Sequence, residues 1–418
     1  MADDQGSPVG GASASPLGTH GASSPNDGGA SPPKSDVSPP KSTGSPAPAA
    51  SPQAQTGILG PEHWAAQAQQ EDDDANSDLG SDAASSTASI TSTILQYRTI
   101  HGRSYHSEQG SAQYWGSNDQ PQQDVMDINH HTLTLGIGDK LHLAPLEPEN
   151  LRVFLQPNFF SFLLLLLLFY REAPCWTRTD NTLQTVLDIG TGTGIWAIDF
   201  ADLYPNAHVI GTDISPIQPA WVPPNLQFEI EDCTREWTFH EDSIDYTHIR
   251  WLVGSIQDWD WFMGQAYRIT RPGGWVESHE TSSIITSDDN TVAEDSPMGQ
   301  WGKFFIEGSK KLGSTFTVVE DGLQRKAMEA AGFVDIHEFD FKCPIGDWPK
   351  DPVLKEMGRF TQHGLETDTE GFVLFMGHTL GWSREEIQVY IAQLRNQMRS
   401  GASHAYYNQK VVWGRKPN

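Results

Sequence analysis

The chain has 418 residues, of which 54 are acidic and 27 basic, so its formal net charge at pH 7 is -27. Extended binding of DNA or RNA is therefore disfavoured, because that affinity depends on Lys and Arg side chains that neutralise phosphates. The three cysteines, Cys175, Cys233 and Cys343, offer neither a disulfide framework nor the ligand spacing of a metal site, so we expect an intracellular protein of the cytoplasm or the nucleus.

Residues 1–93 are rich in Ser, Pro, Ala, Gly and Asp and contain few large apolar side chains. Such a segment buries too little surface to offset chain entropy, so we predict a disordered tail. Its repeated Ser-Pro pairs are consistent with a Pro-stiffened linker or with sites for proline-directed kinases, whose phosphates would change the charge of the tail. These pairs begin at Ser7, Ser15, Ser24, Ser31, Ser38, Ser45 and Ser51.

Residues 94–150 are predicted to form a helical lid. The apolar spacing between Val125 and Leu135 favours a helix. His130 and His131 are adjacent, so they point to different sides of that helix, and no acidic partner stands at a metal-ligand spacing. We interpret the two histidines as polar helix surface.

Residues 151–184 contain an unusual apolar run from Phe159 to Tyr170. This run is shorter than the roughly 20 residues that a membrane-spanning helix needs, so no membrane span is expected. It also lacks the periodicity of an amphipathic helix, and a surface helix would expose its leucines to water. We treat the segment as an anomalous insertion.

From residue 185 to 418, short β-rich runs alternate with helical stretches, which predicts an α/β fold whose sheet carries helices on both faces. One further helix is predicted to end at Gly332, just before the last two strands. A helical insertion at about 352–399 separates these two strands. The strands are expected at 185–190, 208–215, 226–232, 243–250, 273–280, 334–342 and 406–416, and the other helices at 195–205 and 259–270.

A glycine loop follows the first of these strands. Dinucleotide sites use G-x-G-x-x-G, whereas Gly190, Gly192 and Gly194 form G-x-G-x-G, and Ile195 stands where the dinucleotide pattern needs glycine. Asp188 lies two residues before the loop, where a carboxylate suits a ligand with a positive amine. S-adenosylmethionine carries an ammonium and a sulfonium and no phosphate, so the loop favours that ligand over a nicotinamide dinucleotide.

Two more acids follow successive strands. Asp213 ends the second strand, where a carboxylate can accept both hydroxyls of a ribose, and Asp232 follows the third strand, within reach of an adenine amino group. Ligands bind at the carboxyl ends of strands in such sheets, so these acids should converge on the loop. The residues expected to bind the cofactor are Asp188, Gly190, Thr191, Gly192, Gly194, Asp213, Ile214, Asp232 and Cys233.

The blocks "VLDIGTGTGIWAIDF", "HVIGTDISPIQPAW", "SIDYTHIRWLVGSIQDW" and "YRITRPGGWVESHE" resemble the fungal LaeA-type methyltransferases, and the resemblance extends from about residue 94 to the end outside the anomalous insertion. It implies a class I methyltransferase (Rossmann-like) fold, S-adenosylmethionine bound by the glycine loop, and a possible association with velvet-type regulatory proteins in the control of secondary metabolism. Family members pass directly from an "APLENP"-like stretch into "VLDIGTGTG". We therefore hypothesise that residues 152–184 are translated from an unspliced intron; a genuine hydrophobic insertion or a membrane-associated segment are the alternatives.

Methyl transfer needs an aligned acceptor and exclusion of water, and a general base only where the acceptor must lose a proton. The candidate catalytic residues are His248, Arg250, Glu277, His279 and Glu280. Arg250 could instead hold a carboxylate of the ligand or of the acceptor. Four tryptophans could line an aromatic acceptor pocket, although core packing is the more common role of such residues; they are Trp251, Trp259, Trp261 and Trp275.

Two classes of function are compatible with these features. The first is an active methyltransferase acting on a small molecule or a protein side chain. The second is a regulatory subunit that binds S-adenosylmethionine with little turnover and acts through its partners.

Overall fold

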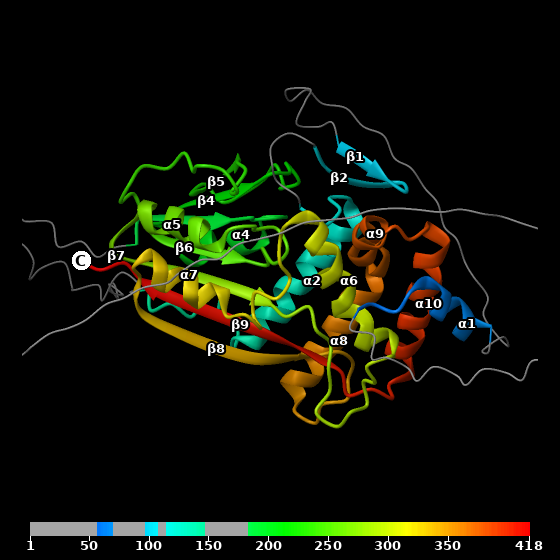
Figure 1. The fold of residues 1–418 in the computed structure, drawn as a ribbon. Coiled ribbons are helices and arrows are strands. Elements are labelled where there is room, and N and C mark those ends of the chain that lie inside the picture. Colours follow the sequence, from blue (N-terminus) through cyan, green and yellow to red (C-terminus); the bar gives the residue numbers. More distant parts are fainter. Residues whose placement is uncertain (1–56, 70–96, 108–113, 147–182) are drawn as a thin grey trace, which may run out of the picture. The chain divides into compact units, whose positions relative to one another are not determined.

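A computed structural model describes residues 57–69, 97–107, 114–146 and 183–418 (Figure 1). Residues 1–56 and 147–182, which include most of the predicted tail and of the anomalous insertion, lie outside the described residues. No helix within the described ranges is long and apolar enough to cross a membrane.

The centre of the fold is a seven-stranded sheet with the strand order β5-β4-β3-β6-β7-β9-β8. The first five strands in that order are parallel, and β9 runs antiparallel to both of its neighbours. This arrangement confirms the predicted α/β sheet and adds the antiparallel end that the sequence pattern alone did not specify. The strands are β3 (Thr185–Ile189), β4 (His208–Asp213), β5 (Leu226–Ile230), β6 (Ile244–Arg250), β7 (Thr270–Thr281), β8 (Val334–Pro344) and β9 (Tyr406–Arg415).

Helices cover both faces of the sheet, because successive residues of a strand point to opposite faces. Val186 of β3 packs into a cluster with α4 (Ile195–Leu203), while its neighbour Leu187 packs into the larger cluster that includes α5 (Trp259–Ile269) and α7 (Leu323–Ala331). Gly332 adopts a left-handed conformation that ends α7, as predicted.

Figure 1 shows a layer of further helices at one end of the sheet, the end where β9 begins. Since β9 is antiparallel to β7, this is the end where the parallel strands finish. The helical insertion predicted before the last strand is confirmed as three helices, and α6 joins them from an earlier position in the chain. These helices are α6 (Pro297–Leu312), α8 (Pro352–Thr367), α9 (Thr369–Leu380) and α10 (Arg384–Ser400).

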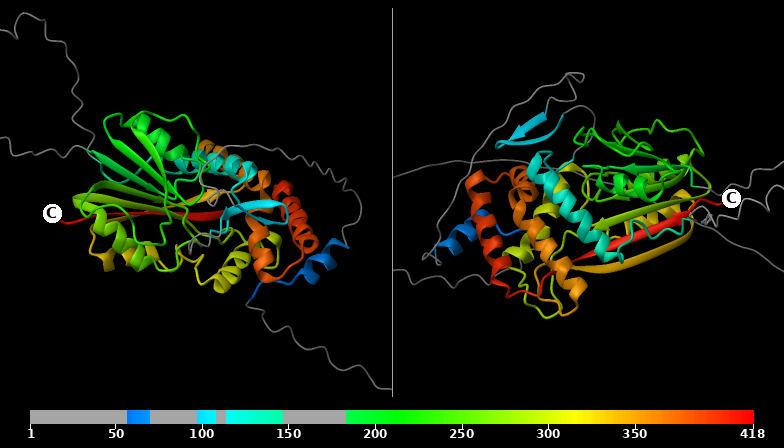
Figure 2. Two further views of the ribbon diagram at one scale, coloured as in Figure 1. Left: turned by 90° about the horizontal axis from the view of Figure 1, so that it is seen from above. Right: turned by 180° about the vertical axis from the view of Figure 1, so that it is seen from behind.

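The segment before the insertion supplies the hairpin of β1 (Tyr97–Ile100) and β2 (Arg103–Ser107) and the helix α2 (Gln120–Gly136). Seen from behind in Figure 2, α2 runs between α9 and the strands. Arg103 fastens this segment, because its guanidinium binds the carboxylates of Asp119 and Asp368 at 2.6–2.7 Å. The helix predicted from Val125 to Leu135 is thereby confirmed and anchored.

One part of the predicted disordered tail differs from the prediction. Residues 61–68 form α1 (Pro61–Ala68), whose Trp64 is fully buried and packs edge-on against Tyr390 of α10 at 5.2 Å between ring centroids. Gln393 Nε2 donates to the Trp64 carbonyl at 2.8 Å. The average composition of the tail does not reveal such a short apolar segment. Its packing partners lie more than 300 residues away in the sequence, so no local pattern indicates the contact.

Candidate functional site

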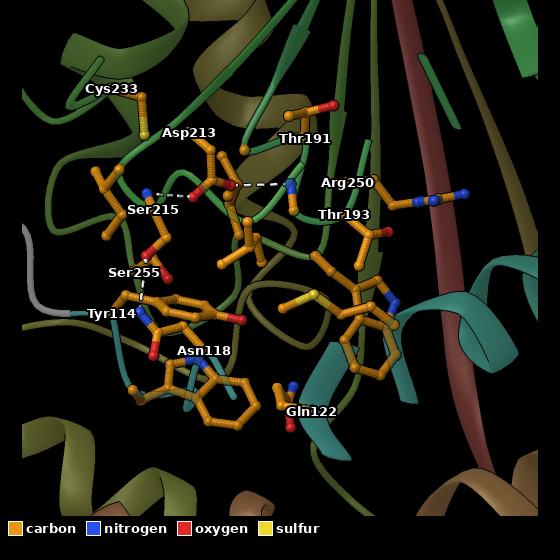
Figure 3. A pocket seen from close by; sticks show the side chains of 18 of the residues that line it. Tyr114, Asn118, Gln122, Thr191, Thr193, Asp213, Ser215, Cys233, Arg250 and Ser255 are labelled. Atoms are coloured by element: carbon orange, nitrogen blue, oxygen red, sulfur yellow. Dashed lines mark hydrogen bonds between the residues drawn. The ribbon is translucent and has the colours of Figure 1, made fainter. Parts of the chain in front are cut away.

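A large cavity opens at the carboxyl ends of β3, β4, β5 and β6 (Figure 3). It encloses a space of about 1190 Å³, counting the part that is open to solvent. Its floor is the glycine loop between β3 and α4, and its opposite wall comes from residues 114–129. This is the edge where an open α/β sheet binds its ligands.

The glycine loop needs its glycines for two different reasons. Gly190, Gly192 and Gly194 all have positive φ, at 69°, 59° and 83°, a conformation that disfavours any side chain. A Cβ on Gly194 would lie 2.3 Å from the Phe228 ring, so this glycine allows close packing of α4 on the sheet. Gly190, Thr191 and Gly192 line the cavity, whereas Gly194 does not.

Asp213 occupies the position predicted for it, at the end of β4 and on the cavity wall. Its two carboxylate oxygens accept the backbone N–H groups of Gly192 and Ser215, both at 2.9 Å. Burial raises the pKa of Asp213 to about 6, against the lowering effect of those hydrogen bonds. No cation pairs with this carboxylate among the described residues, so it is suited to accept hydrogen bonds from a neutral ligand.

Asp188 is not on the cavity wall, contrary to the prediction that it faces the ligand. One of its carboxylate oxygens binds His248 Nδ1 at 2.7 Å, and the other accepts from Thr191 Oγ1 at 2.6 Å. The side chain is 3% exposed, so both oxygens are committed inside the protein. Asp188 therefore shapes the glycine loop from below.

The residues after β5 reach the cavity as expected. Asp232 and Cys233 line it together with Ile214 from β4. Asp232 Oδ1 accepts from Thr234, while its buried Oδ2 has no hydrogen-bond partner within the described parts of the chain and lies 3.3 Å from Arg235 Nε. Burial raises the pKa of the Cys233 thiol, which therefore stays protonated and is no nucleophile.

Most of the predicted catalytic residues lie away from the cavity. His248 stacks on Trp196 at 3.6 Å between ring centroids, and burial lowers its pKa to about 4. Glu277 accepts the backbone N–H groups of residues 143 and 144, and Glu280 accepts those of residues 252 and 253. His279 is buried too. None of the four lines the cavity, so this geometry does not favour them as candidates for a general base.

Arg250 is the exception, because it lines the cavity where β6 ends. Its Nη2 donates to His130 Nδ1 at 3.1 Å, and His130 Nε2 lies 3.0 Å from Asp199 Oδ2. Burial lowers the pKa of Arg250 to about 10, which leaves it cationic at neutral pH. Figure 3 draws Arg250 on the far side of Thr191 and Thr193 from Asp213.

The interpretation of His130 as polar helix surface is wrong. It is 6% exposed because α2 packs against α4, whereas its neighbour His131 stays on the solvent side with 46% of its side chain exposed. The hydrogen-bonding partners of His130 come from β6 and α4, so no local pattern in the sequence could have indicated them.

The wall opposite the glycine loop comes from the segment predicted as a helical lid, but the sequence indicated none of the side chains that this segment adds to the cavity. Asn118 Nδ2 lies 3.5 Å from Ser215 Oγ, and Thr193 Oγ1 donates to Asp127 at 2.7 Å, so the two walls are joined at both ends. The Gln122 side-chain oxygen is buried in this wall, and none of the residues that the structure describes donates a hydrogen bond to it. The other residues that this wall adds to the cavity are Tyr114, Trp115, Ser117, Val125, Met126 and Asn129.

One of the four tryptophans meets the expectation of an aromatic pocket. Trp251 follows β6, has a φ of 58° and lines the cavity, while its backbone N–H donates to the His279 carbonyl at 3.0 Å. Trp259 packs in the core, Trp261 is on the surface with 36% exposed, and Trp275 borders the cluster around α4.

Comparison with known proteins agrees with this geometry. Residues 159–338 match the family model described as "Methyltransferase domain". The chain is 33% identical over 328 residues to the methyltransferase pytC of Aspergillus terreus, an alignment that covers 78% of this chain and 90% of pytC. It is 31% identical over 320 residues to the secondary metabolism regulator LAE1 of Cochliobolus heterostrophus, covering 76% of this chain and 94% of LAE1.

Among solved structures, a phosphoethanolamine N-methyltransferase of Haemonchus contortus in complex with S-adenosylhomocysteine is similar, with a TM-score of 0.36 and 20% identity. The alignment covers 56% of this chain and 49% of that one.

The strand order, the glycine loop and the cavity at the carboxyl ends of the strands define a Rossmann-like methyltransferase. The chain belongs to the methyltransferase family that includes pytC and the LaeA/LAE1 proteins. The cofactor of this family is S-adenosylmethionine. The site fits that group, since it offers a buried carboxylate without a cationic partner at Asp213 and a loop of bare backbone, and provides no cradle of cations for a pyrophosphate.

Proposed function

We propose that this protein binds S-adenosylmethionine in the cavity above the glycine loop and methylates a small-molecule acceptor. The observation that carries the proposal is the position of Asp213. Its buried carboxylate ends β4 beside the loop and is held by two backbone N–H groups, with lone pairs left for further donors. This is the arrangement that recognises the two hydroxyls of a ribose.

Each wall of the cavity then has a distinct role. Asp213 would accept from the ribose hydroxyls, and the buried Oδ2 of Asp232 would accept from the adenine amino group. Ile214 and the neutral Cys233 would provide apolar surface for the adenine ring. Gly190 and Gly192 would allow the amino-acid end to approach the backbone, and Arg250 would bind its carboxylate.

The bound cofactor supplies a methyl group on a positively charged sulfur. Held by Asp213, Asp232 and Arg250, it would offer that methyl carbon to the acceptor, with the neutral thioether as the leaving group. The ionisable groups that line the cavity besides Tyr114 and Cys233 are Asp213, Glu231, Asp232 and Arg250, and none of them is a histidine. This protein would therefore act chiefly by alignment and by exclusion of water, and a hydroxyl acceptor would keep its proton through the transfer and release it to solvent as the product leaves.

Calorimetry with S-adenosylhomocysteine tests cofactor binding, and NAD serves as the negative control. Incubation with a methyl-labelled cofactor and a metabolite extract then tests turnover. We expect label in a small molecule. Label confined to protein, or no binding of S-adenosylhomocysteine, would contradict the proposal.

A regulatory role is the second candidate, and the similarity to the secondary metabolism regulator LAE1 favours it. In that case the protein would bind the cofactor, assemble with a velvet-type partner and transfer few methyl groups. Purification from the source cells distinguishes the two, since a stable partner and the absence of labelled small molecules would indicate regulation.

A further inference from the structure

A second cavity adjoins the first, and the two share three aromatic side chains, those of Trp115, Trp251 and Phe372. It encloses about 450 Å³, counting the part open to solvent. We call it the aromatic chamber. Its position beyond the end of β6 places it next to the cofactor cavity, on the side of α6 and α9.

The walls of the aromatic chamber come from elements that are distant in the sequence. Trp301 and Phe305 extend from α6, Phe372 from α9, and Ser282 and Ser283 follow β7. The rings contact one another, since Trp115 lies 5.6 Å from Phe305 and 5.5 Å from Phe316 between ring centroids. The chamber is therefore a preformed packing of rings rather than a gap under a loop.

The lining of the aromatic chamber contains no carboxylate, amine, guanidinium or imidazole. Its hydroxyl groups are already engaged: Ser282 donates to Glu320, Ser283 to the Phe316 carbonyl, and Thr281 to the Ser282 carbonyl. Burial raises the pKa of Tyr407 well above its ordinary value, so this phenol stays neutral. An anionic group entering the chamber would lose its hydration without gaining a partner, which is strongly unfavourable.

One polar atom remains available. The indole N–H of Trp251 is buried, and no acceptor binds it among the described residues. Trp251 borders the cofactor cavity and the aromatic chamber, and it also lines a smaller cavity between α2 and α8. A buried donor without a partner is costly, and an oxygen of a ligand would satisfy it.

From these features we infer that the aromatic chamber is the acceptor subsite and that it takes an uncharged, flat, aromatic small molecule bearing an oxygen. This inference rests on the proposed function and narrows its acceptor class. Aromatic faces stack on Trp and Phe rings with an additional gain beyond area burial, and an oxygen of the acceptor would receive the Trp251 N–H. Phosphorylated molecules do not suit this lining.

The test uses the full-length protein and three probes that differ in charge. Calorimetry in the presence of saturating S-adenosylhomocysteine measures the binding of 2-naphthol, of 2-naphthyl phosphate and of the phenyltrimethylammonium ion. We expect 2-naphthol to bind at least tenfold more tightly than either charged probe. Equal or tighter binding of a charged probe, or no binding of 2-naphthol, would overturn the inference.

Two variants fill the aromatic chamber from the segment after β7. Ser283→Leu and Ile285→Trp each add volume at a residue that lines the chamber and not the cofactor cavity. We expect at least one of them to bind S-adenosylhomocysteine as the parent does and to lose affinity for 2-naphthol at least tenfold. Trp261→Ala, at an exposed tryptophan outside both cavities, is the matched control and should change neither affinity.

The outcomes separate the two proposals. If S-adenosylhomocysteine fails to bind but 2-naphthol binding is lost in the filled variants, the cofactor assignment fails while the chamber stands. If S-adenosylhomocysteine binds and every variant that retains this binding still takes 2-naphthol at the parent affinity, the aromatic chamber is not the site of the probe. If both filled variants lose both ligands, the chamber is not separable from the cofactor cavity, and the inference of a distinct subsite is wrong.

Discussion

Asp188 and His248 lie side by side on the adjacent parallel strands β3 and β6, and the carboxylate meets the imidazole Nδ1 at 2.7 Å. Both side chains are almost fully buried. Because burial lowers the pKa of His248 to about 4, the imidazole is neutral at pH 7 and donates its Nδ1–H to the carboxylate. Asp188, the first acid of the glycine-loop motif, is thus a structural partner of β6, the neighbouring strand in the sheet.

This pair predicts a stability defect. Asp188→Ala should lower the free energy of unfolding by about 3 kcal/mol, since it leaves both His248 and the Thr191 hydroxyl without their buried acceptor. Chemical denaturation measures the loss, and calorimetry of the folded fraction measures affinity for S-adenosylhomocysteine. A stable variant whose affinity alone collapses would show that Asp188 contacts the ligand after all.

Cofactor binding should depend on pH through Asp213. Its pKa of about 6 in the free protein means that protonation competes with the ligand hydroxyls, which favour the carboxylate. If only the ionised form binds, affinity for S-adenosylhomocysteine should fall by about tenfold between pH 7 and pH 5. Asp213→Asn, which has no proton to gain in this range, should bind weakly and with little pH dependence. A parent profile that is flat from pH 7 to pH 5 would remove Asp213 from the site.

The raised pKa of Glu280 predicts that the stability of the protein depends on pH. Burial raises its pKa to about 8, so the folded protein holds this proton more tightly than the unfolded chain. The resulting stabilisation is present below the ordinary pKa near 4.5 and is lost as pH rises through 8. Glu280→Gln keeps an acceptor for the N–H groups of residues 252 and 253 and should flatten the decline in unfolding free energy between pH 6 and pH 9. An identical decline in the variant would assign it to other groups.

The complete burial of Trp64 predicts that α1 contributes to the stability of the fold. Trp64→Ala should cost about 3–5 kcal/mol of unfolding free energy, the usual range for a fully buried tryptophan. Trp221→Ala is the matched control, because Trp221 is 94% exposed and should change stability by less than about 0.5 kcal/mol. Equal effects of the two substitutions would show that α1 does not dock on α10.

The intron hypothesis stays a prediction, since residues 152–182 lie outside the described residues. Leu146 and Leu183, which flank the segment, both pack against the cluster around α4, so a shorter connection between them is sterically reasonable. A chain without residues 152–182 should keep its affinity for S-adenosylhomocysteine and give a higher soluble yield. Sequencing of the mature transcript decides the origin: a major mRNA that retains these codons would contradict the hypothesis.

The sequence by itself determined the parallel part of the sheet and the place of the glycine loop. Both follow from local patterns, namely apolar runs that alternate with helical periodicity and three glycines that all require positive φ. Asp213 was also predictable, because the end of a strand next to the loop is fixed by the order of elements. Asp188 and Asp213 are chemically alike in the sequence, however, and nothing local tells which one lines the cavity.

Tertiary packing determines which of these two carboxylates lines the cavity. The register of β3 against β6 places His248 beside Asp188 and closes it off, whereas the carboxylate of Asp213 stays on the cavity wall. The wall opposite the loop and the aromatic chamber likewise combine residues from about 115 to 407, and only the closed chain brings these together. Burial and pKa depend on such neighbours, and the neighbours are set by contacts between distant elements, which no local pattern in the sequence encodes.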